Sequence, residues 1–176
     1  MPMSARTVYL GLGSNLAPRE SHLVAGLQAV EEALVERRAV HAITLSPWYE
    51  TEAWGMPEGT PAFLNLVAAV ETPMPLDELL ELLLAIERNH GRVRNPESEG
   101  YADRTLDLDV LCTSTSERHA DERLEVPHPR MMSRRFVLQP LFDLAPHLEV
   151  DGQPIGEALD QCPNLPHVEP YPNPED

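Results

Sequence analysis

The amino-acid sequence predicts an α+β domain with a βαββαβ core, and three observations support this. Four short apolar segments bounded by turn residues are typical of strands. Two segments with apolar residues at helical spacing separate the first strand from the second and the third from the fourth. The 176 residues, 42% of them hydrophobic, are enough for one domain with a hydrophobic core and too few for two.

The first three strands and the first helix are expected near the N-terminus. Residues 7–15, "TVYLGLGSN", are typical of a buried strand that ends in a turn permitted by Gly. Pro18 suits the first turn of the helix that follows. Residues 40–51 are the second strand, in which Pro47 indicates an edge or a bend. Residues 63–71, "FLNLVAAVE", are nearly all apolar, so we expect a central strand.

The second helix and the fourth strand lie on either side of a charged segment. Pro75 begins a helix with acidic residues in its first turn, and Gly91 ends it. Residues 92–103 are an irregular charged loop, and residues 105–113 are the fourth strand. The order strand, helix, strand, strand, helix, strand is that of the ferredoxin-like fold, in which helices pack on a mostly antiparallel sheet.

C-terminal additions follow this core. Residues 133–146 are expected to be helical, with Pro140 at a kink or boundary. We therefore expect a single domain over residues 1–162. Residues 163–176 are rich in prolines and acids and contain few core candidates, so we expect an extended or disordered tail.

The composition excludes several classes of function. The net charge is −16 and all 13 cations are arginine, which argues against nucleic acid or an anionic membrane as a partner. No apolar run approaches the ~20 residues that a membrane span needs. The chain has only 2 cysteines, without metal-type spacing, and its start does not resemble a signal peptide. We expect a cytoplasmic protein.

Residues 104–111, "RTLDLDVL", contain two acidic residues in a strand pattern, where acids are disfavoured. Asp107 and Asp109 would lie on one face of the strand, because successive side chains alternate between faces. A polar face turned to water would explain this pattern. A magnesium site would also explain it, because Mg²⁺ is usually held by one or two carboxylates, with waters and substrate phosphates completing its shell.

Arginine is concentrated around this strand, since residues 88–135 contain 9 of the 13 arginines. The guanidinium group matches phosphate bidentately and keeps its charge at any working pH. For any single arginine, pairing with a nearby acid is the simpler interpretation; for a cluster that flanks two aspartates we favour a polyphosphate ligand. The arginines concerned are Arg92, Arg94, Arg104, Arg123, Arg130, Arg134 and Arg135.

Other residues are candidates for a site, each with a simpler alternative. His128 lies between two prolines, in a stiff loop that could fix its imidazole against a phosphate or be an ordinary loop. Asn65 interrupts an apolar strand, so its amide must bond to backbone or to a polar heterocycle. Trp54, Phe63 and Phe136 are either core residues or walls for such a ring. The "GLGSN" turn lacks the lysine of a Walker-type loop, so we interpret it as structural.

Six segments taken in order carry a resemblance to a known family. They are "YLGLGSN" (9–15), "FLNLV" (63–67), "IERNHGRVR" (86–94), "RTLDLDVL" (104–111), "RLEVPHPRM" (123–131) and "RRFVLQPLFDLAP" (134–146). With them the chain resembles the 6-hydroxymethyl-7,8-dihydropterin pyrophosphokinases of folate biosynthesis. The combination of "RTLDLD" with "VPHP" and a following Arg is more specific than any segment alone.

The resemblance implies a monomeric enzyme that transfers the pyrophosphoryl group of ATP to the pterin's hydroxymethyl oxygen and releases AMP. It implies that Asp107 and Asp109 bind two Mg²⁺ ions. It assigns the phosphates and the transition state to Arg92, Arg94 and Arg104, which with Asp107 and Asp109 form the catalytic set. It implies an ATP site that contains Glu87, Arg94, Arg104, Val110, Arg123, His128 and Arg134. It implies a pterin site that contains Thr51, Glu52, Trp54, Phe63, Asn65 and Phe136.

Three segments depart from the family's pattern. The loop "NPESEGYAD" (95–103) is acidic where the family commonly has a basic and aromatic loop. The segment "EAWG" (52–55) stands where the family has a Pro-Pro-Leu-Gly-like stretch, and Pro129 stands where an aromatic residue often follows the histidine. The aspartates and core arginines are retained, so we expect an active enzyme with altered kinetics.

Two alternatives remain open at this point. Ferredoxin-like palm domains of polymerases and cyclases also hold paired aspartates on a strand, but enzymes that handle nucleic acid should carry a wider basic surface than a net charge of −16 allows. A non-catalytic nucleotide- or metal-binding regulator would bind ATP without turnover.

Overall fold

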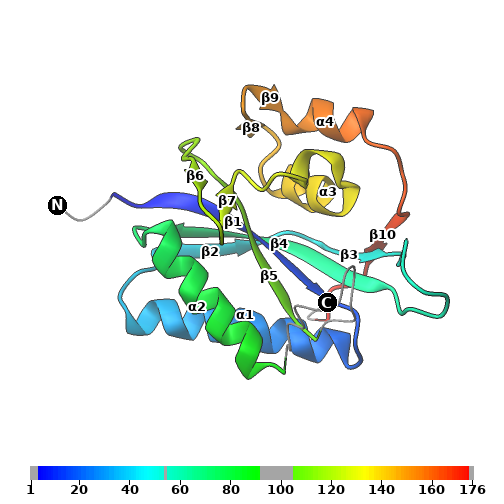
Figure 1. Ribbon diagram of the computed structural model, residues 1–176, viewed down its shortest axis with the longest axis horizontal. Coiled ribbons are helices and arrows are strands. Elements are labelled where there is room, and N and C mark those ends of the chain that lie inside the picture. The colour runs from blue at the N-terminus through cyan, green and yellow to red at the C-terminus, as the bar shows by residue number, and fades with distance from the viewer. Residues whose placement is uncertain (1–3, 54, 92–104, 175–176) are drawn as a thin grey trace.

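A computed structural model describes residues 4–53, 55–91 and 105–174, and its elements are arranged around one main sheet (Figure 1). The elements are β1 (Arg6–Ser14), α1 (Arg19–Glu36), β2 (Ala42–Leu45), β3 (Trp48–Thr51), β4 (Phe63–Thr72), α2 (Leu76–Asn89), β5 (Asp107–Thr113), β6 (His119–Ala120), β7 (Glu125–Val126), the 3-10 helix η1 (Met131–Ser133), α3 (Arg135–Leu144), β8 (Glu149–Val150), β9 (Gln153–Pro154), α4 (Ile155–Gln161) and β10 (Val168–Tyr171).

The main sheet has six strands in the order β10-β3-β4-β1-β5, with β2 also paired to β4. All of its described pairs are antiparallel. With α1 after β1 and α2 after β4, this arrangement confirms the ferredoxin-like βαββαβ core. The apolar segment 63–71 is a central strand, as expected from its composition, because β4 has β1 on one side and β2 and β3 on the other.

Pro47 bends the second predicted strand into two short ones, β2 and β3. Pro47 has no backbone N–H to donate to the neighbouring strand, so the ladder cannot continue through it. Ser46 keeps the bend attached to β4: its N–H donates to the Val67 carbonyl at 2.9 Å, and its Oγ accepts the Val67 N–H at 2.9 Å.

Helices cover both faces of the sheet (Figure 1). On one face α1 and α2 pack over a core that includes Leu10, Leu64, Leu79 and Leu106, all at most 1% exposed. On the other face α3 and α4 enclose a second core that includes Tyr9, Val67, Leu111, Leu138 and Ile155. The sequence predicted the first layer and only the beginning of the second, the helix near 133–146.

The alternation of side chains in β5 is as predicted. Leu106, Leu108 and Val110 are buried in the core under α1 and α2, whereas Asp107 and Asp109 are half-buried on the opposite face. Glu87 of α2 supports the start of the strand, because its Oε1 accepts the Leu108 N–H at 2.9 Å. The strand is therefore fixed in the core on one side and offers two carboxylates on the other.

Part of the segment after residue 162, expected to be extended or disordered, is a strand of the main sheet. Residues Val168–Tyr171 are strand β10, which pairs with β3 at the edge of the main sheet, with Val168 opposite Thr51. β3 pairs with β4 on one side, so the backbone groups on its other side are open to a partner. β10 lies at the edge of the sheet, where Pro170 is tolerated. No local pattern marks such a long-range pairing. Among the described residues, no helix is both long and apolar enough to cross a membrane.

Candidate active site

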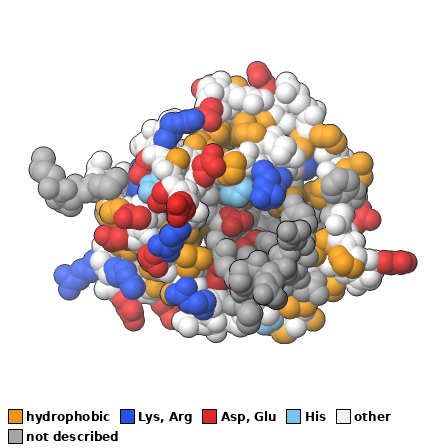
Figure 2. Space-filling model, viewed as in Figure 1, with side chains coloured by type: hydrophobic (Ala, Val, Ile, Leu, Met, Phe, Trp, Pro, Cys, Tyr) orange, Lys and Arg blue, Asp and Glu red, His pale blue; other side chains and the backbone are white. Residues whose placement is uncertain are grey.

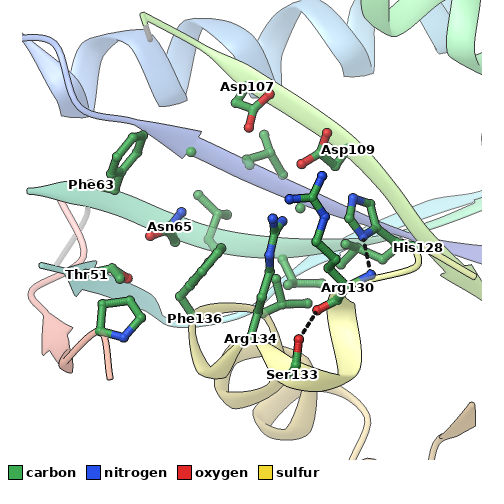
Figure 3. A pocket seen from close by; sticks show the side chains of 18 of the residues that line it. Thr51, Phe63, Asn65, Asp107, Asp109, His128, Arg130, Ser133, Arg134 and Phe136 are labelled. Atoms are coloured by element: carbon green, nitrogen blue, oxygen red, sulfur yellow. Dashed lines mark hydrogen bonds between the residues drawn. The ribbon is translucent and has the colours of Figure 1, made fainter. Parts of the chain in front are cut away.

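A pocket of about 670 Å³ lies on the α3 side of the sheet. Its lining comes from β1, β3, β4 and β5, from residues that follow β3, from the segment between His128 and the first turn of α3, and from the segment before β10 (Figure 3). Figure 2 shows acidic side chains in a hollow of this face, with arginine and histidine side chains along one side. The lining includes Gly11, Gly13, Thr51, Glu52, Met56, Phe63, Asn65, Asp107, Asp109, His128, Arg130, Ser133, Arg134, Phe136, Leu165 and Pro166.

The floor of the pocket is bare backbone of β1. Gly13 lies opposite Asp107 on one side and opposite Asn65 on the other, so one row of the sheet reads Asp107, Gly13, Asn65. The next row reads Asp109, Gly11, Val67. A Cβ at Gly13 would lie 2.9 Å from Nδ2 of Asn65, which is closer than real Cβ contacts. The two glycines thus leave open space between the carboxylates and the amide.

Asp107 and Asp109 form the acidic end of the pocket, and both side chains point into it (Figure 3). Two half-buried carboxylates on one strand face, beside an unobstructed floor, fit a hard cation such as Mg²⁺. The described residues contain no group of three or more His, Cys, Asp or Glu side chains placed to hold a metal. From the described residues, Asp107 and Asp109 would be the ligands of a magnesium ion, with phosphate and water oxygens in the rest of its shell.

His128, Arg130 and Arg134 form a basic side across from the carboxylates (Figure 3). Within the described chain, neither arginine has a carboxylate at ion-pair distance, in contrast to Arg6, Arg19, Arg118 and Arg123. The Arg130 N–H donates to Nδ1 of His128 at 3.1 Å, so the neutral imidazole carries its proton on Nε2. Burial first, and then the charges of Arg134 and Arg130, lower the pKa of His128, while Asp107 opposes the shift. An anion beside these three side chains would offset the repulsion between the two guanidinium charges and accept the Nε2–H of His128.

The opposite end of the pocket is aromatic and polar. Phe63 and Phe136 line it, and the Arg134 guanidinium lies 5.6 Å from the centre of the Phe136 ring. Oδ1 of Asn65 and Oγ1 of Thr51 are buried and have no hydrogen-bond partner within the described residues. An unsatisfied buried acceptor is costly. A planar heterocycle with N–H groups would satisfy Asn65 and fit beside the two rings.

Most of the residues assigned by resemblance that the structure describes meet in this pocket. They are Thr51, Glu52, Phe63, Asn65, Asp107, Asp109, His128, Arg134 and Phe136. Trp54, Arg92, Arg94 and Arg104 lie outside the described residues.

Three expected ATP-site residues are not in the pocket lining. Glu87 is 1% exposed and hydrogen-bonds to the Leu108 N–H, and Val110 lies in the core on the face opposite Asp109. Arg123 forms an ion pair with Glu81 of α2. The side-chain alternation of a strand already separates Val110 from the aspartates, so the sequence itself contained this signal.

The sequence interpretation missed several lining residues. It included Arg130 in the arginine cluster for which a polyphosphate was favoured, but left it out of the ATP site. It took Gly11 and Gly13 as structural, although glycines at alternate positions of a strand leave one face without side chains. It also gave no role to Ser133, Met56, Leu165 or Pro166. Leu165 and Pro166 reach the pocket only because β10 returns to the sheet, which no sequence pattern indicated.

Comparison with known proteins agrees with this geometry. The family model described as 7,8-dihydro-6-hydroxymethylpterin-pyrophosphokinase (HPPK) matches residues 9–146. A 2-amino-4-hydroxy-6-hydroxymethyldihydropteridine pyrophosphokinase of Pseudomonas aeruginosa is 44% identical over 158 residues, which cover 89% of this chain and 91% of that protein. A protein of the same name from Porphyromonas gingivalis is 41% identical over 145 residues, covering 82% of this chain and 95% of its own length.

Solved structures share the fold. A crystal structure of HPPK-DHPS in complex with substrates has a TM-score of 0.65 at 14% identity, and wild-type HPPK-DHPS of Plasmodium falciparum with SDX-DHP has a TM-score of 0.63 at 13% identity. Both alignments cover 90% of this chain, which spans less than half of those longer chains, 43% and 44%. From the family match and the identity to its curated relatives, the chain belongs to the 7,8-dihydro-6-hydroxymethylpterin-pyrophosphokinase family.

Proposed function

We propose that this protein transfers a pyrophosphoryl group from ATP to the hydroxymethyl group of 6-hydroxymethyl-7,8-dihydropterin, a step of folate biosynthesis. The hydroxymethyl oxygen attacks the β-phosphorus of ATP, the bond from that phosphorus to the α–β bridging oxygen breaks, and AMP leaves. The hydroxyl proton is released, and the product is the pterin diphosphate. Membership of the family and the names of the relatives support this reaction.

The observation that carries the proposal is the row Asp107, Gly13, Asn65 across three neighbouring strands. The row has a carboxylate that suits a metal–phosphate group at one end and, at the other, an amide oxygen that has no partner among the described residues and suits a heterocycle. Within the sheet, Gly13 is the residue between them. Reaction between a polyphosphate and a ring substituent needs both reactants held together in this way.

The aromatic end would bind the pterin. Asn65 Oδ1 and Thr51 Oγ1 would accept hydrogen bonds from N–H groups of the ring, and Phe63 and Phe136 would contact its faces. Buried acceptors that only the correct ligand satisfies favour that ligand strongly over analogues without the matching N–H groups. Glu52 and Trp54 are proposed at the rim on the strength of the family resemblance.

The other end would bind the triphosphate. Asp107 and Asp109 would hold Mg²⁺, and we propose two ions, which neutralise phosphate charge and orient the reacting oxygens when bound. Arg134, Arg130 and the Nε2–H of His128 would donate to phosphate oxygens. We retain Arg92, Arg94 and Arg104 as transition-state residues, and Glu87, Val110 and Arg123 as ATP-site residues, from the family resemblance alone.

The test is a nucleotide assay. The protein is incubated with Mg²⁺, ATP and 6-hydroxymethyl-7,8-dihydropterin, and the nucleotides are separated. AMP should form only when this pterin is present, and it should not form with 6-methyl-7,8-dihydropterin, which has the same ring and no hydroxyl to attack. Release of ADP, or ATP binding without turnover, would instead support the alternative enzymes or a regulator. We further propose that the protein acts on these small molecules as a cytoplasmic monomer.

A further inference from the structure

We propose that Leu165 is a substrate-binding residue that covers the pterin in this protein, and that β10 exists to hold it there. Leu165 and its neighbour Pro166 line the pocket on the side of Thr51 and Glu52. This inference rests on the proposed function and adds to it a part of the chain beyond residues 9–146, the span matched by the family model.

Leu165 is an apolar side chain that the fold holds largely exposed to water. It is 62% exposed, the highest exposure of the three large hydrophobic side chains exposed in the described parts of the chain. Val35 and Leu45, the other two, do not line the pocket. A leucine exposed at the mouth of a pocket gains from any ligand that removes its surface from water.

The backbone around Leu165 is tied directly to the pterin end. The His167 carbonyl accepts the Glu52 N–H at 3.1 Å, and Val168 pairs with Thr51. The strand that carries Thr51, whose hydroxyl has no partner in the described parts of the chain, thus also fixes the chain two to three residues after Leu165. Leu165 is therefore positioned by the same ladder as the side chain proposed to bind the pterin edge.

A second anchor lies at the far end of β10. The Tyr171 hydroxyl donates to Glu20, and the Arg19 guanidinium lies 5.7 Å from the centre of the Tyr171 ring. Arg19 also pairs with Glu50 at 2.8 Å and donates to the Ala62 carbonyl at 2.9 Å. Glu50 precedes Thr51 and Ala62 precedes Phe63, so one arginine joins β10 to both strands of the pterin end.

Leu165 and Pro166 directly precede β10, which is anchored at both of its ends, so they form a preorganised wall of the pocket. The wall needs no closure, so its contacts form as soon as the pterin binds and persist in the transition state. Uniform contacts of this kind lower KM without changing kcat. The wall would contact the apolar surface of a planar bicyclic ring, because its side chains are those of a leucine and a proline.

The experiment compares Leu165→Ala with Leu45→Ala, which removes the same atoms from an exposed leucine, 43% exposed, outside the pocket. Steady-state assays measure KM for the pterin, KM for ATP and kcat. Fluorescence titration measures equilibrium binding of the pterin.

In Leu165→Ala the pterin KM and Kd should rise about 3- to 10-fold, as expected for partial loss of a leucine's burial, with kcat and the ATP KM unchanged. Leu45→Ala should match wild type, and Leu165→Met should largely restore binding.

The outcomes separate the two proposals. If wild-type protein makes AMP and Leu165→Ala has the pterin KM and Kd of wild type, the inference is wrong and the proposed function stands. If wild-type protein makes no AMP with the pterin, the proposed function is wrong, and the titration still decides whether Leu165 contributes to binding of the ring. A loss in kcat with unchanged pterin KM would also overturn the inference, because a binding wall does not act on the chemical step alone.

Discussion

Gly13 and Asn65 lie opposite each other on neighbouring strands, so close that a Cβ at position 13 would lie 2.9 Å from the Asn65 Nδ2 atom. The absence of a side chain on β1 is thus what allows the Asn65 amide to point into the pocket.

Gly13→Ala should impair pterin binding. The new methyl group would displace the Asn65 amide, and a displacement of this kind in a positioning group costs about 10- to 100-fold in kcat/KM for the pterin. Gly11→Ala is the matched control on the same strand and face, because its Cβ would be 3.4 Å from the flexible end of Leu111. A Gly13→Ala variant with the pterin KM of wild type would show that Asn65 does not bind the ring.

Asp107→Asn and Asp109→Asn should each abolish most turnover while the fold survives. Each change removes one of the two carboxylates proposed to hold Mg²⁺, and the loss of metal-based charge stabilisation should lower kcat by about 100-fold or more. Circular dichroism should be unchanged, because both side chains are only half-buried. Asp160→Asn, an exposed residue of α4, is the control. Near-normal rates in either pocket variant would contradict the metal assignment.

The sequence predicted those features that depend on local patterns. The alternation in "RTLDLDVL" placed Leu106 and Leu108 in the core and Asp107 and Asp109 on the other face, and Pro47 marked the bend between β2 and β3. These follow from backbone geometry, which repeats over two to four residues.

Features that depend on pairing between distant segments could not be predicted from local sequence patterns. Leu165 reaches the pocket through a ladder between segments more than 100 residues apart, and a four-residue strand containing Pro170 has no pattern of its own. Arg123 and Arg134 look alike in the sequence, yet one is paired with Glu81 and the other lines the pocket. The two arginines are distinguished only by the fold, which puts Arg123 beside Glu81 of α2 and Arg134 in the pocket.

The pKa of His128 should lie below its ordinary value in the free protein and rise when Mg²⁺ and ATP bind. Burial and the charges of Arg134 and Arg130 disfavour the imidazolium, and a bound triphosphate would favour it. Because the folded-state pKa is lowered, the unfolded chain takes up the proton first, so this group makes stability fall as pH drops below about 6.5. NMR titration of the imidazole, assigned with His128→Gln, measures both values. A pKa that does not move with ATP would place the phosphates elsewhere.

Tyr49→Phe should loosen the contact between β3 and α3. The Tyr49 hydroxyl donates to Asp143, which also accepts from Gln139, so the bond ties the strand of Thr51 to the helix of Phe136. Asp143 is exposed and can be rehydrated, so the free energy of unfolding should fall by only about 1 kcal/mol. Tyr9→Phe is the matched control: Tyr9 is also 8% exposed, and its hydroxyl has no hydrogen-bond partner among the described residues.

The hydrogen bond between Tyr49 and Asp143 also makes the free energy of unfolding depend on pH. Burial, followed by the hydrogen bond and the charge of Asp143, raises the pKa of Tyr49. The unfolded chain therefore loses this proton first, near pH ~10, and the stability that the proton supports is present below that pH and lost above it. Urea unfolding at pH 8 and above pH ~10 should show wild type losing its advantage over Tyr49→Phe as pH rises. An advantage that grew with pH would mean that the tyrosinate, not the phenol, is the form bound in the fold.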